Sequence, residues 1–232
     1  MLMPAILLEV CVDQLAGLAA AVAGGADRIE LCSWLALGGL SPKQELLQLA
    51  GASPVPVVAR IRPRGGDFCF DAVEVQLMLN DIDAAAHAGL QGVSLGATLR
   101  DGRLDQATLA RLVARARDHG LVCTLHRAID INPDLAQATR LAIDLGFERI
   151  LTSGGAPAAG QGINGLLRCF DAAAGRIAIM PGAGIDAANI ARLREKLPLT
   201  EVHASCSLPA PGTAEGRTTS IAKVAALVQA LR

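Results

Sequence analysis

The chain is short of aromatic residues and of lysine, and each shortage excludes a class of function. Only 2% of its 232 residues are aromatic, with one tryptophan and no tyrosine, so few rings are available for stacking on nucleic-acid bases. The formal net charge of −1 also argues against a nucleic-acid partner. The only lysines are Lys43, Lys196 and Lys223, which fall in predicted helices. A Schiff-base aldolase needs a lysine on a strand facing its substrate, so we exclude that class.

Long apolar runs are missing as well, although 52% of the residues are hydrophobic. No run approaches the roughly 18 residues of a membrane-spanning helix, so we expect no membrane partner. The first residues show no charged region followed by a cleavage site, which predicts a cytoplasmic protein. Six cysteines without a CxxC pair then indicate reduced thiols rather than disulfides. Because no GxGxxG motif follows the first predicted strand, we expect no nucleotide cofactor.

What the sequence does contain is a unit repeated eight times, a short β-rich run followed by a helix. Cap signals mark helix starts, such as Asp71, Asp105, Ser41-Pro42 and Asn132-Pro133. Eight equal units without a linker favour a closed ring over an open sheet, and they predict an α/β fold, a single (β/α)8 TIM barrel domain over residues 1–232. The predicted strands are Ile6–Val10, Asp27–Leu31, Val57–Ile61, Gly92–Leu95, Leu121–His126, Glu148–Thr152, Ile177–Met180 and Glu201–Ala204.

Polar residues gather where the predicted strands end, and a closed barrel brings these ends to one rim. Because side chains alternate along a strand, Glu9 and Glu30 are expected to point toward the barrel axis. A buried charge is costly unless it is paired, so we expect a network at the rim. Its expected members are Glu9, Glu30, Arg62 and His126, with His203 closing the ring from the eighth strand. That network could serve catalysis, or it could only tie the strands together. The candidate catalytic residues are Glu9, Glu30, His126 and His203.

Loops rich in arginine or glycine follow three of the strands and suit an anionic ligand. The segment Arg62-Pro63-Arg64-Gly65-Gly66 combines forked donors with a backbone that a ligand can approach closely. Two glycine-rich turns offer backbone N–H groups to phosphate or carboxylate, although such turns also simply connect a strand to a helix. The candidate anion-binding residues are Arg62, Arg64, Ser153, Gly154, Gly182 and Gly184.

The cysteines permit a metal site. Cys11 and Cys32 each lie two residues beyond a strand-end glutamate, on neighbouring strands about 4.8 Å apart. Cys206 follows the eighth strand, which borders the first in a closed barrel. Three sulfurs on one arc could hold Cu(I), which prefers thiolate. Cysteine is also a common small core residue, and spacing alone favours that alternative. Cys123 is expected to face the helices, and Cys169 to pack within one.

A series of short segments stands out in order along most of the chain, from residue 6 to about 205: LEVCVD (8–13), GADRIELC (25–32), GGLSP (38–42), IRPRGGDF (61–68), HRAID (126–130), LTSG (151–154), PGAG (181–184) and EVH (201–203). Together these segments resemble the CutC copper-homeostasis family. The resemblance implies a cytoplasmic TIM barrel that forms a homo-oligomer (dimer or higher) and takes part in copper handling. In that family, Cu(I) binding is attributed to cysteines that match Cys11 and Cys32.

Two hypotheses about function remain. The first, which we adopt, is a cytosolic CutC-type protein that binds Cu(I) through Cys11 and Cys32, with help from Cys206 or His203. The second is an enzyme of unassigned reaction that acts on a small anionic substrate bearing phosphate or carboxylate. A pure interaction scaffold would leave the charged rim unexplained.

In the enzyme hypothesis, the rim residues would divide the work of acid–base catalysis. His126 or Glu30 would act as general base, and Glu9 or His203 would be its partner. Arg62 and Arg64 would clamp the anion. The irregular stretch over residues 205–219 would follow the eighth strand and lie over the same rim.

Overall fold

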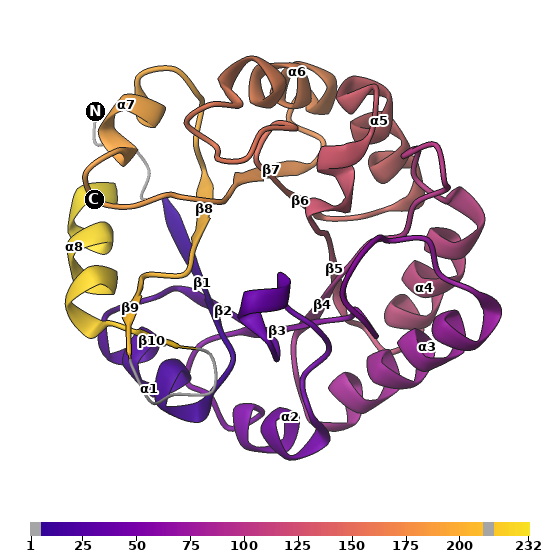
Figure 1. Ribbon diagram of the computed structural model, residues 1–232, viewed down its shortest axis with the longest axis horizontal. Helices are drawn as coiled ribbons and strands as arrows, with labels where there is room; N and C mark the ends of the chain where they lie inside the picture. The colour runs from indigo at the N-terminus through magenta and orange to yellow at the C-terminus, as the bar shows by residue number, and fades with distance from the viewer. Residues whose placement is uncertain (1–5, 211–215) are drawn as a thin grey trace.

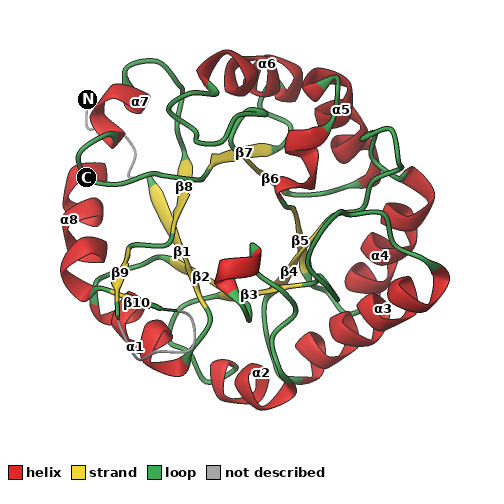
Figure 2. Ribbon diagram, in the orientation of Figure 1, coloured by secondary structure: helices red, strands yellow, loops and turns green. Residues whose placement is uncertain are grey.

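Eight parallel strands form a ring that is surrounded by helices (Figures 1 and 2). The computed structural model describes residues 6–210 and 216–232. The barrel strands are β1 (Leu7–Val12), β2 (Arg28–Leu31), β3 (Val57–Arg60), β4 (Gly92–Leu95), β5 (Val122–Leu125), β6 (Arg149–Thr152), β7 (Ala178–Pro181) and β8 (Glu201–Ala204). The helices are α1 (Leu15–Ala23), α2 (Gln44–Ala50), α3 (Ala72–His87), α4 (Gln106–Asp118), α5 (Leu135–Leu145), α6 (Ile163–Ala173), α7 (Ile190–Arg194) and α8 (Ile221–Leu231), with 3-10 turns η1 (Leu35–Leu37) and η2 (Arg127–Ile131).

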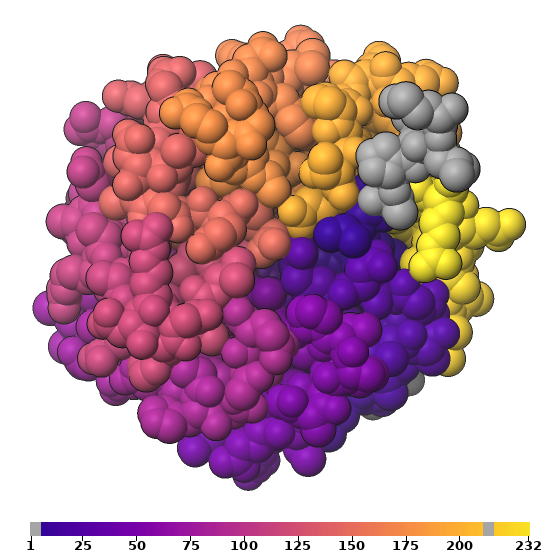
Figure 3. All heavy atoms as spheres, turned by 180° about the vertical axis from the view of Figure 1, so that it is seen from behind, coloured from indigo at the N-terminus to yellow at the C-terminus, as the bar shows by residue number. Residues whose placement is uncertain are grey.

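The last barrel strand pairs with the first, which confirms the predicted TIM barrel. Each strand from β1 to β6 is hydrogen-bonded to the next one in the chain, and β8 returns to β1 with Glu9 opposite His203. β7 and β8 lie side by side, with no ladder between them in the described part of the chain, so the ring is nearly closed. Seen from behind, atoms fill the middle of the molecule, which is therefore a packed core and not a pore (Figure 3).

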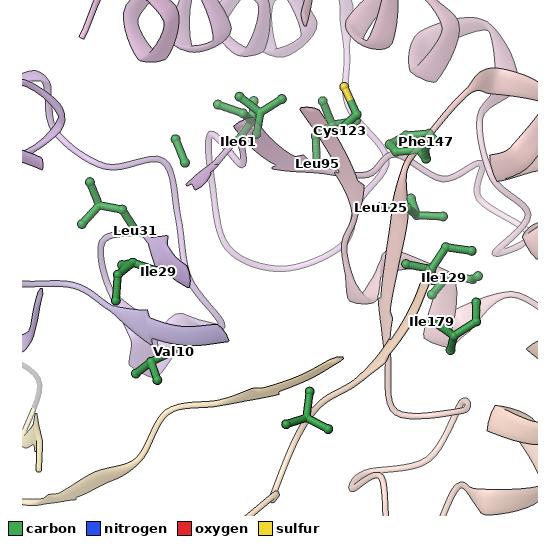
Figure 4. Packing of buried hydrophobic residues seen from close by; sticks show 14 of the residues in the cluster. Val10, Ile29, Leu31, Ile61, Leu95, Cys123, Leu125, Ile129, Phe147 and Ile179 are labelled. Atoms are coloured by element: carbon green, nitrogen blue, oxygen red, sulfur yellow. The ribbon is translucent and has the colours of Figure 1, made fainter. Parts of the chain in front are cut away.

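Alternation along the strands divides the core into two sides. Apolar side chains such as Val10, Leu95 and Leu125 are fully buried, and they pack in the layer between strands and helices (Figure 4). Cys123 points toward the helices as expected. Burying one such aliphatic side chain contributes roughly 1.5–3 kcal/mol, so this layer supplies most of the stability. The opposite positions face the barrel axis, and several of them carry charge.

Helix starts follow the cap signals in two cases and depart from them in two. The Asp71 carboxylate accepts N–H bonds from the first turn of α3, and Asp105 caps α4 in the same way. The cap predicted at Ser41 is wrong: α2 begins after Lys43, because the Ser41 hydroxyl accepts the backbone N–H of Arg62. The cap predicted at Asn132 is also wrong, since Asp134 caps α5.

The stretch after β8 is more ordered than an irregular connector. It forms an antiparallel hairpin of β9 (Ser207–Pro209) and β10 (Arg217–Thr219), while residues 211–215 lie outside the described part. Ser220 then caps α8. Among the described residues, every helix is too short or too polar to cross a membrane.

Candidate functional site

A charged layer lies inside the barrel, closer to the amino ends of the strands. Arg28 on β2 donates to the carboxylates of Glu9 on β1 and Glu201 on β8. Arg149 on β6 also donates to Glu201, with Nε 3.1 Å from Oε2. Burial lowers the pKa of Arg28, but the two carboxylates raise it above its ordinary value. Two arginines and two glutamates balance in charge, and we call these four residues the lower layer.

A second set of polar residues, one level closer to the mouth, is centred on Glu30. Its Oε2 atom accepts both Arg60 Nη2 at 3.2 Å and His203 Nε2 at 3.0 Å. Burial raises the pKa of Glu30, but the Arg60 guanidinium and the His203 hydrogen bond together lower it by more. The net pKa therefore lies below the ordinary value, and the carboxylate is charged. His203 loses basicity through burial but gains more from Cys11 and Glu30, and its pKa lies well above the usual 6.5. An imidazolium at neutral pH follows.

Cys11 joins this set from β1. One ligand atom each of Cys11, Glu30 and His203 lies within 4.8 Å of the others, and all three residues are buried. A thiolate sulfur and an imidazole nitrogen are both ligands that copper accepts. The same three groups also resemble a nucleophile, a base and a carboxylate partner. The sequence placed all three at this rim, and the structure brings them together.

The other two cysteines of the predicted arc lie near Cys11. Cys32 is fully buried, and its Sγ donates to the carbonyl of Val12 at 3.4 Å. Burial raises the pKa of Cys32 well above its ordinary value, and the neighbouring Cys11 adds to this. Burial also raises the pKa of Cys206 to about 11, with a further contribution from Cys11. All six cysteines of the chain are free.

His126 faces the axis from the end of β5 and is fully buried. Its Nδ1 accepts the backbone N–H of Ala128 at 3.1 Å, so Nε2 carries the hydrogen. Burial and the charge of Arg60 lower the pKa of His126 well below 6.5, and the ring is neutral. The ring of Phe68 packs against it with centroids 5.1 Å apart. His126 is thus a hydrogen-bond donor in this site and a poor acceptor of a further proton.

Arg62 holds the loops of the rim rather than the carboxylates. Its guanidinium donates to the carbonyl of Leu37 at 3.0 Å and to that of Gly66 at 2.7 Å, and it stacks over Phe68. The sequence predicted Arg62 as the partner of the rim acids. The structure gives that place to Arg28 and Arg60 instead, because they lie on strands β2 and β3 beside the carboxylates.

Arg64 braces its own loop. It pairs with Glu74 at 2.5 Å and with Asp67 at 2.9 Å, and its guanidinium lies 5.3 Å from the ring of Phe70. Its side chain is 38% exposed. The donors that the sequence assigned to an anion are therefore used by the loop itself and by the first turn of α3.

The turn at Ser153-Gly154 surrounds a carboxylate of the protein itself. Asp130 accepts the backbone N–H groups of Ser153 and Gly155 and the hydroxyl groups of Thr152 and Ser153. The backbone N–H of Gly154 donates to Thr152 Oγ1. This turn has the chemistry of an anion site, and in this structure Asp130 fills it.

The glycines after β7 support His203. The N–H of Gly182 donates to the carbonyl of Thr152 at 3.0 Å. A Cβ atom at Gly182 would lie 3.3 Å from that of His203 and 2.5 Å from Leu151 Cδ1. The carbonyl of Gly184 accepts the side-chain amide of Asn189. Close packing is thus the structural reason for glycine at position 182.

Some residues of the site were not among the candidates from the sequence. Arg28, Arg60 and Arg149 complete the ion pairs, and Ser94 on β4 lies beside Glu30. Ser94 was detectable in principle, because it is a polar residue within the buried run Gly92–Leu95. The partners of the arginines could not be detected from the sequence, since each ion pair joins different strands.

Comparisons with known proteins agree with this architecture. A CutC protein from Rhizobium meliloti (strain 1021) is 56% identical over 209 residues, covering 90% of this chain and 84% of that protein. The crystal structure of a CutC from Streptococcus agalactiae, described as a copper homeostasis protein, superposes with a TM-score of 0.81 at 28% identity, over 86% of this chain and 98% of that one.

A more distant neighbour, a 4-hydroxy-2-oxoglutarate aldolase, has a TM-score of 0.62 at 17% identity over 97% of this chain and 94% of that one, and it shares the fold alone. None of the lysines here lies on a strand: Lys43 precedes α2, Lys196 follows α7 and Lys223 lies in α8. The CutC family pattern matches residues 6–208. With that match and these identities, the chain belongs to the CutC family.

Proposed function

We propose that this protein serves copper homeostasis by binding Cu(I) at the mouth of the barrel. The observation that carries the proposal is the convergence of Cys11 with His203 and Glu30 within 4.8 Å. Thiolate is the ligand that Cu(I) prefers, and imidazole is also suitable. Cu(I) is the cargo of the site in this proposal and not a resident cofactor.

Cys11 and Cys32 are the proposed thiolate ligands, with His203 as the nearest additional donor. To bind the metal, Cys32 would give up the hydrogen bond that its S–H group donates to the Val12 carbonyl. Burial raises the pKa of Cys32, so the metal must displace a proton that the thiol holds firmly. Copper affinity should therefore rise with pH. Cys206 is a less suitable donor, because it lies beyond β8 at the edge of the hairpin.

The test is a titration of reduced protein with Cu(I) against a competing chelator. We expect the Cys11→Ser/Cys32→Ser double variant to lose high-affinity binding. Cys69→Ser is the matched control, because Cys69 is half-buried and its thiol contacts the Thr98 hydroxyl at 3.8 Å, outside the proposed ligand set. An unchanged affinity in the double variant would overturn the assignment.

We further propose a cytoplasmic location and a homo-oligomer, a dimer or higher. Size-exclusion chromatography with light scattering tests the second point, and a monomer at micromolar concentration would contradict it. A second candidate function, an enzyme acting on a small anion, is favoured by one specific observation. Buried donors near Glu30 have no hydrogen-bond partner within residues 6–210 and 216–232.

A further inference from the structure

Three buried hydrogen-bond donors on neighbouring strands have no hydrogen-bond partner among the residues that the structure describes. They are the Arg60 Nε–H on β3, the Ser94 hydroxyl on β4 and the His126 Nε2–H after β5. These residues are only 7%, 1% and 0% exposed. An unpaired buried donor is unfavourable, so three of them on one wall of a folded protein point to a ligand.

The strand register brings the three donors to one place. Arg60 and Ser94 occupy paired positions on β3 and β4, and Ser94 pairs in turn with Thr124 on β5. His126 lies two residues beyond Thr124, and residues two apart on a strand point to the same side. We call Arg60, Ser94 and His126 the donor wall.

Charge around the donor wall is not balanced, in contrast to the lower layer. Arg60 pairs with Glu30, which is the nearest carboxylate. Arg62 is 5% exposed and donates to carbonyl groups, with no carboxylate ion pair in the described part of the chain. Two permanent cations therefore meet one buried carboxylate. A buried excess of positive charge favours an anionic ligand.

Glu30 adds an acceptor to this wall. Its Oε2 atom accepts two donors, but its Oε1 atom has no hydrogen-bond partner among the described residues. The Ser94 hydroxyl faces the Glu30 carboxylate and helps to lower its pKa, but it is outside the geometry of a full hydrogen bond. A ligand that satisfies the whole set needs an oxyanion for the donors and a hydroxyl for Glu30.

We propose that Arg60, Ser94 and His126 bind the carboxylate of a small hydroxy acid whose hydroxyl group donates to Glu30 Oε1. This site goes beyond the proposed copper function and does not require the metal. It also differs from the loop sites that the sequence indicated, because the donors lie on strands inside the ring.

The segment Trp34–Gly39, which contains η1, closes over the donor wall. In Figures 1 and 2 this short helical turn lies over the middle of the ring. A Cβ at Gly39 would lie 3.4 Å from Arg60 Nε, and a Cβ at Gly38 would lie 2.9 Å from Arg62 Nη1. Both glycines have φ above +80°. In this proposal, the segment shifts to let a hydroxy acid reach the donors. The fluorescence of Trp34, the only tryptophan in the chain, would report that shift.

The experiment is a fluorescence and calorimetric titration of the reduced, copper-free full chain. The probes are glycolate, acetate and inorganic phosphate at equal ionic strength. We expect glycolate to bind about tenfold or more tightly than acetate, because acetate leaves Glu30 Oε1 without a donor. Binding of phosphate but not glycolate would overturn the hydroxy-acid assignment. Failure of all three probes in both assays would overturn the site.

Variants separate this site from the copper proposal. Ser94→Ala should weaken glycolate binding about tenfold and lower the unfolding midpoint only slightly, because within the described residues the hydroxyl has only a weak interaction with Glu30 to lose. Ser205→Ala on the exposed rim is the matched control and should bind glycolate normally. The Cys11→Ser/Cys32→Ser variant should also keep glycolate binding, even if copper binding fails. Equal glycolate affinity in Ser94→Ala and the unaltered protein would refute the donor wall.

Discussion

Replacing Arg28 by methionine tests the lower layer most directly. Methionine keeps much of the volume of the side chain and removes the guanidinium that joins Glu9 to Glu201. Both carboxylates are buried, at 1% and 6% exposure. The change therefore leaves acids inside the barrel rather than at a surface where water could hydrate them.

The expected loss of unfolding free energy follows from the ion pairs that Glu201 and Glu9 keep without Arg28. Glu201 keeps Arg149, whose Nε lies 3.1 Å from its Oε2. Among the residues that the structure describes, Glu9 keeps only His203, with Nε2 at 3.9 Å from Oε1, which is too long for a hydrogen bond. Removing one partner of a buried pair costs about 3–5 kcal/mol. Since a domain is stable by about 5–15 kcal/mol, Arg28→Met should lose at least a fifth of the free energy of unfolding.

Urea unfolding followed by circular dichroism gives this free energy. The second variant, Arg28→Met/Glu9→Gln, should recover most of the loss because the unpaired charge is gone. Arg103→Met is the matched control, since its pair with Asp101 is exposed at 62% and 50%, and an exposed ion pair contributes little to stability. A single variant within about 1 kcal/mol of the parent, or a double variant no more stable than the single one, would refute the reasoning.

Two further predictions concern the mouth of the barrel. The folded pKa of His126 lies well below 6.5, so the unfolded chain binds a proton there that the folded protein does not. As the pH falls below about 6.5, the free energy of unfolding should decrease by up to about 1.4 kcal/mol per pH unit. Urea titrations at several pH values should show that His126→Gln lacks this decrease. Parallel pH curves for the variant and the parent would contradict the prediction. Gly182→Ala should cost about 1–3 kcal/mol, measured by thermal unfolding, because the new Cβ meets Leu151 and His203. Gly160→Ala is the control, because a Cβ there meets nothing within 4 Å and the backbone is not in the left-handed region; equal losses in both variants would count against packing as the cause.

The candidate site was only partly within reach of the sequence. Alternation along the strands predicted that Glu9, Glu30, His126 and His203 would face the axis, and the structure places all of them inside the ring and buried. Their catalytic role stays a prediction. The loop donors were predicted to bind an anionic ligand, but in the structure they bind carboxylates of the protein: Arg64 pairs with Glu74, and the turn at Ser153 surrounds Asp130.

The sequence by itself determined the architecture. Eight strand–helix units with apolar residues at alternate strand positions can bury both faces of a parallel sheet only by surrounding it with helices, and the ring follows from their number. The partners of the charges were decided by tertiary structure alone. Arg28 reaches Glu201 across 173 positions of the chain, and Asp130 fills a turn 23 residues away. Hydrogen bonds act over about 3 Å in space, so no local pattern reveals which distant groups will meet.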